Sequence, residues 1–428
     1  MRLARAAILA AGLIAGVAAG SGADAYTMHV LYTFPDGSPT FSGLLRDASG
    51  TFYGTAQSGR TGYGYVYKMY QPSPGSHWKV LDIHDFGTDG ELGLDLIQDT
   101  SGNLYGLTFQ SSEGPGRFFE LSPPPPGVNK WTETLLAFAP QGNSLIRRLT
   151  YAGQSEGLAY DGVSPIYGVM GSPSGAHARG EAFSLAQSGG VWSFADIYDF
   201  CSTGRKFCTD GADPSGGLTM DQAGNLYGAA RSGGAHHHGV AYELSPNGLG
   251  GWSQSVIYSF CAVHFCLDGE EPGDDLLLDT ASGTLYGATG RGGVRPCRQH
   301  WERGCEGVVY SLAPDGGGWD LTVLATFCKR VACADGARPS GLVRDGSGTL
   351  FGVTDVGGII ASNAPWGGGT VFSVTGTAQR LYAFCKQTDC NDGRLPNARL
   401  ALDPSGNIFG TTQNGGTYDS GVVFELTP

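Results

Sequence analysis

The chain carries little charge, and that charge is not concentrated anywhere. Only 15% of its 428 residues are charged, and 26 Lys and Arg face 39 Asp and Glu, which gives a formal net charge of −13. No basic tract is present, which argues against the phosphate-holding surface of a nucleic-acid-binding protein. Beyond the N-terminal segment, no apolar run reaches the roughly 18 residues that a membrane-spanning helix needs. We therefore expect no nucleic-acid partner and no membrane span.

Glycine, by contrast, is abundant. It contributes 71 of the 428 residues, well above the average of about 7%. No Gly-x-y period occurs, which excludes collagen, and 11% aromatic residues argue against disorder. Because glycine costs a helix interior about 1 kcal/mol per residue, the composition predicts a turn-rich, all-β protein.

Residues 1–25 have the features of a secretory signal peptide. Arg2 and Arg5 precede an Ala-, Leu- and Gly-rich stretch, and Ala23-Asp24-Ala25 fits the small-x-small cleavage rule. We expect cleavage after Ala25, so that residues 26–428 are secreted or periplasmic and lie in an oxidising compartment.

A seven-fold internal repeat organises the rest of the chain. Its most regular phrase is Leu-Tyr-Gly or a variant, with successive aromatic residues 52 to 65 residues apart; these are Tyr53, Tyr105, Tyr167, Tyr227, Tyr286, Phe351 and Phe409. In each unit an apolar run ends in Asp, and three more short β-forming runs follow, separated by turn residues. Four strands in each of seven units predict a seven-bladed β-propeller that forms a single domain. The third unit is the most divergent.

The order of the runs predicts how the ring closes. With the run that ends in Asp as the innermost strand, the last unit has only three strands, because the chain stops at Pro428. The missing outer strand is found at the other end, at residues 29–34. We expect it to pair with residues 422–426 and so remove a free sheet edge. The recurring Trp of the outer hairpins is expected to pack between blades.

The repeat resembles the GloVer tandem-repeat family of secreted "choice-of-anchor" proteins. The phrases that carry the resemblance lie in residues 407–416 and 421–426 and recur over nearly all of residues 28–428. This resemblance implies a secreted or surface-anchored propeller-like array, and it implies no particular reaction or ligand.

Ten cysteines fall into five close pairs. The pairs are Cys201 and Cys208, Cys261 and Cys266, Cys297 and Cys305, Cys328 and Cys333, and Cys385 and Cys390. Four of them follow the outermost-strand phrase, and their second cysteine precedes Asp-Gly. This repeated placement predicts five local disulfides that fix loop shape. Zinc is the weaker alternative, since no Cys-x-x-Cys pair occurs.

The loops of one face are predicted to carry any binding site. This face holds the loops closed by the predicted disulfides, which we call the stapled loops, together with the Asp-Gly pairs and the Gly-Gly loops. The candidate carboxylates are Asp210, Asp268, Asp335 and Asp392. They could bind a cation or sugar hydroxyls around the channel, or they could simply form turns by bonding their own backbone. The residues His236–His238 are expected to form a solvated loop rather than a metal site.

Two further loops offer candidate contact residues. The loop between Cys297 and Cys305 presents His300, Trp301 and Arg303, which could contact a carbohydrate or a protein, or could cap the fold with an inward-packed Trp301. Trp366 is a weaker candidate of the same kind.

Together these features favour a non-enzymatic, monomeric binding module with an extracellular partner such as a carbohydrate, an envelope polymer or a protein. The alternatives are a propeller hydrolase or lyase acting on polysaccharide, and a structural surface protein. The common hydrolase, metalloprotease and nucleotide-binding motifs are absent, although propeller enzymes can assemble a site from several blades without one. No cofactor is expected, and a bound calcium ion is the alternative.

Overall fold

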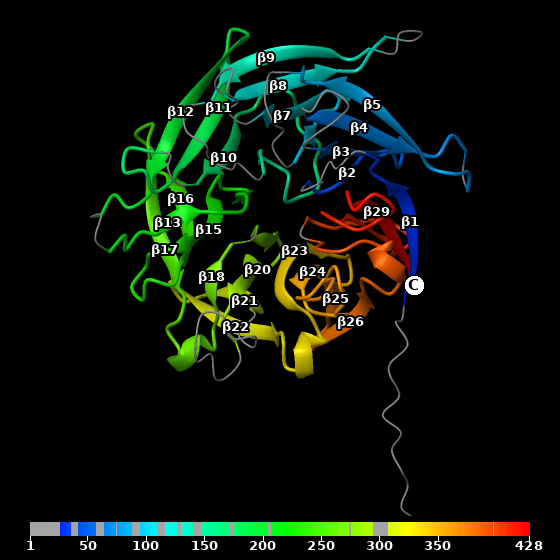
Figure 1. The fold of residues 1–428 in the computed structure, drawn as a ribbon. Coiled ribbons are helices and arrows are strands. Elements are labelled where there is room, and N and C mark those ends of the chain that lie inside the picture. Colours follow the sequence, from blue (N-terminus) through cyan, green and yellow to red (C-terminus); the bar gives the residue numbers. More distant parts are fainter. Residues whose placement is uncertain are drawn as a thin grey trace, which may run out of the picture.

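Seven small antiparallel sheets surround a central axis in the computed structural model (Figure 1), which confirms the predicted seven-bladed β-propeller. The structure describes residues 26–35, 42–56, 64–73, 75–87, 95–108, 116–125, 130–139, 148–171, 175–203, 207–273, 275–293, 307–396 and 398–428. The predicted signal peptide lies outside these residues.

Each blade runs from an inner to an outer strand. Blade 1 contains β2 (Leu45–Arg46), β3 (Phe52–Ala56), β4 (Tyr65–Tyr70) and β5 (Lys79–Asp85), and blade 2 contains β6 (Ile97–Gln98), β7 (Leu104–Thr108), β8 (Arg117–Ser122) and β9 (Thr132–Phe138). Blade 3 contains β10 (Ile166–Met170), β11 (Glu181–Ser188) and β12 (Val191–Asp199). Its inner strand is reduced to a bridge between Thr150 and Tyr167, in line with the divergence of this unit.

In blades 4 and 5 the inner strand is divided into two short pieces. Blade 4 contains β13 (Ala212–Pro214), β14 (Thr219–Met220), β15 (Leu226–Ser232), β16 (Val240–Pro246) and β17 (Trp252–Ser259). Blade 5 contains β18 (Glu270–Pro272), β19 (Leu277–Asp279), β20 (Thr284–Arg291), β21 (Val308–Asp315) and β22 (Gly318–Thr326). Blade 6 contains β23 (Ala337–Arg344), β24 (Leu350–Val356), β25 (Thr370–Val374) and β26 (Ala378–Ala383). The described helical segments are the 3-10 turns η2 (His264–Cys266), η3 (Val331–Cys333) and η4 (Thr388–Cys390).

The two ends of the chain share blade 7, as predicted. This blade contains β27 (Ala401–Leu402), β28 (Ile408–Thr411), β29 (Val422–Thr427) and the N-terminal β1 (Thr27–Thr33). β1 pairs antiparallel with β29, with Met28 opposite Leu426 and Val30 opposite Phe424. Figure 1 shows the blue β1 beside the red β29, which closes the ring.

The glycine of the repeated Tyr-Gly phrase makes room for an aromatic ring of the next strand. A Cβ added to Gly228 of β15 would lie 2.5 Å from the Tyr242 hydroxyl oxygen, and one added to Gly352 of β24 would lie 2.5 Å from the end of the Phe372 ring. These rings are fully buried. The repeat therefore keeps glycine here because any side chain would overpack the blade core.

Tryptophans of the outer hairpins pack between blades, as predicted. Trp252 of blade 4 lies 5.6 Å from the ring of Tyr167 in blade 3, and Trp319 of blade 5 lies 6.0 Å from Tyr227 in blade 4. Each pair is edge-to-face, which is the favourable geometry for aromatic rings. The same aromatic positions in successive units thus join neighbouring blades.

Replacing Tyr242 by Phe is expected to leave the protein as stable or to stabilise it by about 1 kcal/mol. The Tyr242 hydroxyl is buried without a hydrogen-bond partner among the described residues, and blades 6 and 7 carry Phe372 and Phe424 at the same position. Removing an unsatisfied buried hydroxyl relieves its desolvation cost. Denaturant unfolding measures the effect, with Tyr242→Ala, expected to cost about 3–5 kcal/mol, as the control. A clear loss of stability in Tyr242→Phe would contradict this account of the core.

No helix in the described part of the chain is long and apolar enough to cross a membrane. Four disulfides are formed, between Cys201 and Cys208, Cys261 and Cys266, Cys328 and Cys333, and Cys385 and Cys390. The local pairing is therefore confirmed for these four pairs, while Cys297 and Cys305 lie outside the described residues. The disulfides indicate an oxidising, extracellular environment.

Candidate functional site

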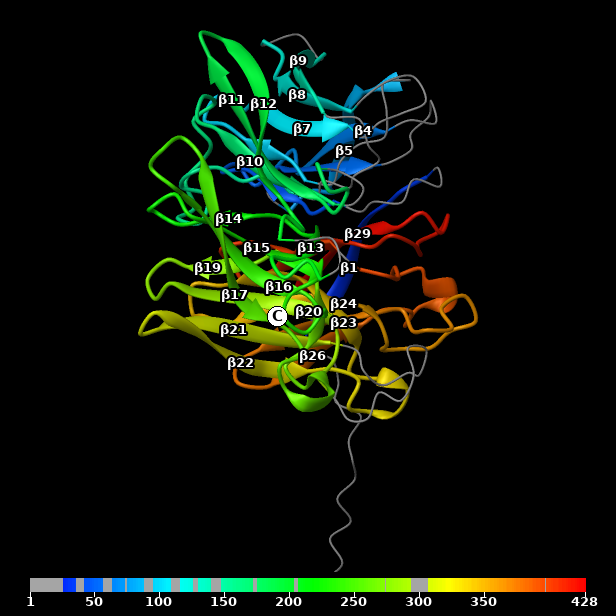
Figure 2. The ribbon, with the colours of Figure 1, turned by 90° about the vertical axis from the view of Figure 1, so that its left-hand side faces the viewer.

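The stapled loops and the Gly-Gly loops lie together on one face. In four blades a backbone hydrogen bond joins the second cysteine to the following Gly-Gly loop, as from Gly234 N to Cys208 O and from Gly416 N to Cys390 O. Figure 2 shows the 3-10 turns of the yellow and orange loops projecting to one side, opposite the tip of the hairpin between β21 and β22. We call these two sides the loop-rich face and the hairpin face.

The stapled loops hold a strained backbone. Cys385 and Cys390 have φ values of 68° and 55°, and Asp389 between them has a φ of 55°. The left-handed region costs a residue with a side chain roughly 1–2 kcal/mol, and the same pattern recurs around Cys261 and Cys328. Each disulfide joins two of these residues and so keeps the loop in its shape.

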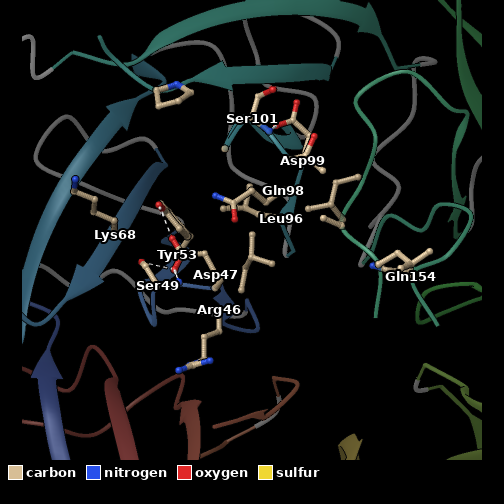
Figure 3. Close-up of a pocket in the computed structure, with 18 of the residues that line it drawn as sticks. Arg46, Asp47, Ser49, Tyr53, Lys68, Leu96, Gln98, Asp99, Ser101 and Gln154 are labelled. Atoms are coloured by element: carbon tan, nitrogen blue, oxygen red, sulfur yellow. Dashed lines mark hydrogen bonds between the residues drawn. The ribbon is translucent and has the colours of Figure 1, made fainter. Parts of the chain in front are cut away.

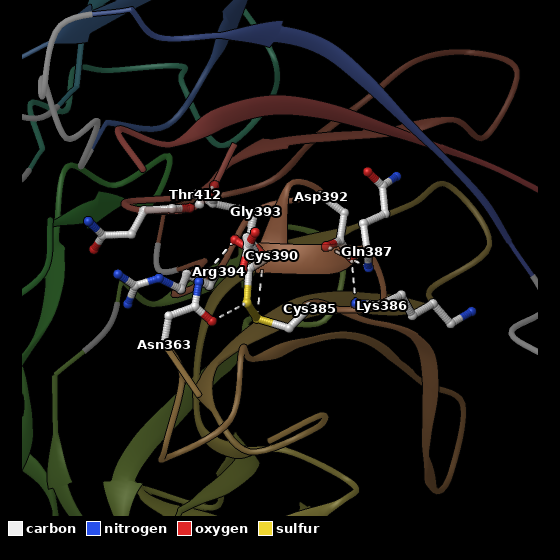
Figure 4. Close-up of a disulfide and its surroundings, with 12 residues drawn as sticks. Asn363, Cys385, Lys386, Gln387, Cys390, Asp392, Gly393, Arg394 and Thr412 are labelled. Atoms are coloured by element: carbon white, nitrogen blue, oxygen red, sulfur yellow. Dashed lines mark hydrogen bonds between the residues drawn. A yellow bond between two sulfur atoms is a disulfide. The ribbon is translucent and has the colours of Figure 1, made fainter. Parts of the chain in front are cut away.

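The Asp-Gly carboxylates accept hydrogen bonds from their own loops, as Figure 4 shows for Asp392. Asp392 accepts hydrogen bonds from the Tyr382 hydroxyl at 2.7 Å, Lys386 N at 3.0 Å and Gln387 N at 3.3 Å. Asp268 and Asp335 likewise accept from two backbone N–H groups each of their own stapled loops. No hydrogen bond in the described part of the chain links two of these carboxylates, and binding of a cation or sugar by them stays a prediction.

Asp210 is held in the same way, with more hydroxyl donors. Burial alone would raise its pKa, but hydrogen bonds from Thr203, Tyr198 and Ser202 bring the pKa of Asp210 below its ordinary value. The hydroxyl oxygens of Thr203 and Tyr198 lie 2.7 and 2.8 Å from it. Asp210 is therefore ionised at neutral pH, and hydrogen bonds from its own loop and from Tyr198 stabilise its negative charge.

The other predicted contact residues are placed only in part. Trp366 lies on the loop between β24 and β25 and is 62% exposed. Its main-chain oxygen accepts a hydrogen bond from Gly357 N at 2.8 Å, which anchors the loop. His300, Trp301 and Arg303 lie outside the described residues, so their predicted role stays a prediction.

A pocket lined by arginines opens where blades 4, 5 and 6 meet, next to the Gly-Gly loops of the loop-rich face. It has a volume of about 320 Å³ and is lined chiefly by Arg231, Arg291, Arg338, Glu271, Asp355 and Ser340. Arg291 Nη1 pairs with Glu271 Oε1 at 2.9 Å, and Arg338 Nη1 lies 4.0 Å from Asp355 Oδ2. We call this the arginine pocket.

Two donors of the arginine pocket are uncommitted within the described part of the chain. Arg231 forms no ion pair with a described residue, and it lies across Gly273 of the next blade, where an added Cβ would be 3.1 Å from Arg231 Nη2. The Ser340 hydroxyl is buried without a hydrogen-bond partner among the described residues. A guanidinium and a hydroxyl that converge on one cavity can receive the oxygens of an anionic group.

The backbone beside the arginine pocket and at the equivalent positions of the neighbouring blades has the same strained conformation. Asp213, Glu271, Arg338 and Leu395 have φ values of 56°, 55°, 58° and 57°, and each precedes a proline. A residue before proline is normally extended, and such outliers concentrate at ligand sites. Hydrogen bonds to the preceding blade hold this conformation, as from Glu271 N to His238 O at 3.0 Å. Sequence reasoning missed these positions, although the recurring x-Pro dipeptides were a signal for them.

Four charged residues line the channel itself. Asp95, Arg148, Asp275 and Arg399 precede the buried leucine of the inner strands of blades 2, 3, 5 and 7; the same position holds Gly43, Gly217 and Gly341 in the other blades. Arg148 Nη1 pairs with Asp275 Oδ2 at 3.1 Å, although 127 residues separate them. We call these four residues the channel collar.

The collar also contains a carboxyl group with a perturbed pKa. Burial, followed by the negative charge of Asp275, raises the pKa of Asp95, and this is partly offset by Arg148, by a hydrogen bond from Gly43 N at 2.9 Å and by Arg399. Asp275 also accepts a hydrogen bond from Gly217 N. The collar thus joins inner strands of non-adjacent blades through charge.

A larger hollow lies on the hairpin face beside blades 1, 2 and 3 (Figure 3). It has a volume of about 880 Å³, and its lining includes Tyr53, Lys68, Gln98 and Gln154. Its two carboxylates, Asp47 and Asp99, are engaged in their own hairpin turns, for example by bonds from Ser49 N and Ser101 N. The hollow shares Leu45, Leu96, Ile97 and Gln154 with a cavity of about 300 Å³ that reaches the collar.

Glu181 predicts a pH dependence of stability. Burial, with the negative charges of Asp196 and Asp199, raises its pKa to about 7, from an ordinary value of 4.5. A raised folded-state pKa contributes stability that is fully present below the ordinary value and is lost as the pH rises through about 7. We expect the free energy of unfolding to fall by about 2 kcal/mol between pH of about 5.5 and 8.5 because of this group.

Urea unfolding at the two pH values, for the wild type and Glu181→Gln, measures this contribution. The variant should lose that part of the pH dependence, whereas Asp320→Asn, at an exposed position of β22, should keep it. Equal pH dependence in the wild type and Glu181→Gln would show that Glu181 titrates normally.

The chain belongs to the Gloeobacter/Verrucomicrobia repeat family, whose model matches residues 42–301 and 297–428. This confirms the resemblance found in the sequence. Among curated proteins no sequence matches the chain.

The similarity to solved structures is distant. A putative gluconolactonase is 13% identical, over 77% of this chain and 89% of that one, with a TM-score of 0.40. A luciferin-regenerating enzyme is 11% identical, over 94% of this chain and 95% of that one, with a TM-score of 0.43.

Proposed function

We propose that this protein is a secreted, non-enzymatic binding module that holds an acidic group of an extracellular carbohydrate in the arginine pocket. The observation that carries the proposal is the convergence of Arg231, Arg291 and Arg338 from three blades on one cavity. Guanidinium groups suit carboxylates because their donors form a planar fork. Export is supported by the four disulfides.

The size and charge of the arginine pocket favour an acidic sugar. Its volume of about 320 Å³ is at the small end of the range for ligand pockets. Three cations face two carboxylates, so the pocket has an excess positive charge in a protein whose net charge is −13. Arg231 and Ser340 would receive the ligand, while the pairs of Arg291 and Arg338 with Glu271 and Asp355 keep those two guanidiniums in place.

The stapled loops would supply the rigidity that such a site requires. Strained residues such as Glu271 and Arg338 keep their geometry only if their surroundings are fixed. Cys266 precedes the first of these residues by five positions, and Cys333 precedes the second by five. A preformed pocket binds more tightly because less freedom is lost on binding. The Asp-Gly carboxylates enter this proposal as loop acceptors and not as catalytic acids, which separates it from the hydrolase alternative.

A glycan array containing oligogalacturonides and their methyl esters tests the proposal. We expect the acidic forms to be captured and the esters to bind at least tenfold more weakly, because esterification removes the charge. Arg231→Gln should weaken capture by about 10- to 100-fold, the effect of one charge-assisted contact. Arg344→Gln, on the opposite face and paired with Asp279 at 3.4 Å, is the matched control and should bind as the wild type does. Equal capture of acids and esters would overturn the proposal.

A further inference from the structure

One stapled loop differs from the others in the side chains that lie against its sulfur atoms. His238, Cys261 and Cys266 each offer a possible metal-ligand atom, and these atoms lie within 4.8 Å of one another. Glu270 Oε2 lies 2.7 Å from His238 Nδ1 and 3.8 Å from Cys266 Sγ. Two sulfurs and an imidazole are thus gathered at one point, and a carboxylate lies beside the imidazole and one of the sulfurs. No other such set of three is present in the described part of the chain.

The other blades show that this gathering belongs to one loop and not to the repeat. Gly239 and Gly369 occupy equivalent positions. The N–H of each donates a hydrogen bond to the carbonyl oxygen of the first glycine of its Gly-Gly loop, and the carbonyl oxygen of each accepts one from the residue before the first cysteine of the next stapled loop. The preceding residue faces the sulfur in both cases, because a Cβ added to Gly368 would lie 2.7 Å from Cys385 Sγ. Blade 4 places His238 at this position, whereas blade 6 has no side chain there.

The carboxylate is equally specific to this loop. Glu270 follows the Asp-Gly pair of the Cys261–Cys266 loop, and the corresponding residues after the next two stapled loops are Ala337 and Arg394. Neither alanine nor arginine offers a metal ligand. The scaffold is therefore repeated, while the imidazole and the carboxylate together occur on only one of the stapled loops that the structure describes in full.

We propose that the Cys261–Cys266 disulfide is a redox-gated zinc site, which forms when the disulfide is reduced. A dithiol reductant would donate two electrons and two protons, break the S–S bond to give two thiols, and itself become a disulfide. Zn²⁺ then displaces the two thiol protons and binds both thiolates with the His238 imidazole and a Glu270 oxygen. Four such donors match the tetrahedral preference of zinc, and binding favours the reduced loop because only that form has both thiolates.

Position and access also suit this role. His238 and Glu270 side chains are 40% and 16% exposed, so an ion can reach donors that are already partly ordered. Both residues flank strands, His238 before β16 and Glu270 at the start of β18, which keeps them in place when the disulfide opens. In the oxidised protein the sulfurs are joined, and the loop serves only as a staple.

Alkylation of the reduced protein tests the site, with another stapled loop of the same molecule as control. The full chain is reduced with a phosphine, which becomes a phosphine oxide with oxygen from water, and is treated with iodoacetamide in the presence of Zn²⁺ or of a chelator. Peptide mass analysis then measures modification of each cysteine. We expect Zn²⁺ to lower alkylation of Cys261 and Cys266 at least tenfold and to leave Cys385 and Cys390 unchanged.

Variants separate zinc binding from simple burial. His238→Ala and Glu270→Gln should each reduce the protection, and the double variant should abolish it, while Arg394→Gln should have no effect. Equal protection of both pairs, no protection of either, or protection that persists in the double variant would overturn the proposal. Loss of the native near-ultraviolet spectrum on reduction that Zn²⁺ does not restore would also overturn it, because a loop that needs its disulfide to fold cannot hold the ion.

Discussion

Deletion of residues 26–35 is expected to destabilise the protein by at least about 5 kcal/mol. The deletion removes β1, which fills the outer position of blade 7, and it removes the fully buried Phe34, whose ring lies 5.5 Å from that of Tyr67 in blade 1. Loss of a buried Phe alone costs about 3–5 kcal/mol. The deletion also leaves β29 as a free edge, which favours aggregation. Calorimetric unfolding and size-exclusion chromatography measure both effects.

Point variants distinguish closure of the ring from the general effect of truncation. Phe34→Ala should show much of the loss of stability, whereas Thr27→Ala, at an exposed position of β1, should unfold as the wild type does. An unchanged unfolding temperature in the deletion variant, with the protein still monomeric, would mean that the ring does not depend on this strand.

Replacement of Arg148 by Met is expected to destabilise the protein by about 3–5 kcal/mol. The variant keeps most of the side-chain volume but leaves Asp275 in the channel collar without its partner at 3.1 Å. An unpaired buried charge costs this much because it keeps the desolvation penalty and loses the compensating attraction. Removal of Arg148 should also raise the pKa of Asp95 further, since this cation now lowers it.

The double variant Arg148→Met/Asp275→Leu should recover part of this loss, because neither charge is then left unpaired. Arg344→Met is the matched control on the hairpin face, where the pair with Asp279 is more exposed and contributes roughly 1 kcal/mol or less. Chemical denaturation compares the four proteins. If Arg148→Met and Arg344→Met caused equally small losses of stability, the collar would not be a buried charge network.

The sequence predicted the architecture because the repeat fixes it locally. Tyr227, Gly228 and the apolar run ending in Asp221 recur at equivalent positions in the other units. The strand order, the position of the inner strand and the shared seventh blade could therefore be predicted from the spacing of the repeat alone. The disulfides followed from the same reasoning, since each pair lies within one loop. Blade 3 kept its place although its inner strand is reduced to the bridge at Thr150, because its two neighbours enclose it.

The arginine pocket and the channel collar could not be predicted in this way. Arg231, Arg291 and Arg338 stand on three blades, and only the curvature of the ring brings them to one cavity. The collar position holds Gly, Asp or Arg in different units, so it has no recurring residue type that a repeat search would detect. Functional residues of a propeller differ between blades, whereas a repeat reveals what the blades share.

A crystal structure of the protein with an oligogalacturonide tests most directly whether an acidic ligand binds in the arginine pocket on the loop-rich face. We predict that the ligand carboxylate lies within hydrogen-bonding distance of Arg231, with Ser340 as a further donor, and that the stapled loops keep their conformation. A ligand found instead in the hairpin-face hollow between Tyr53 and Gln154 would contradict binding in the arginine pocket.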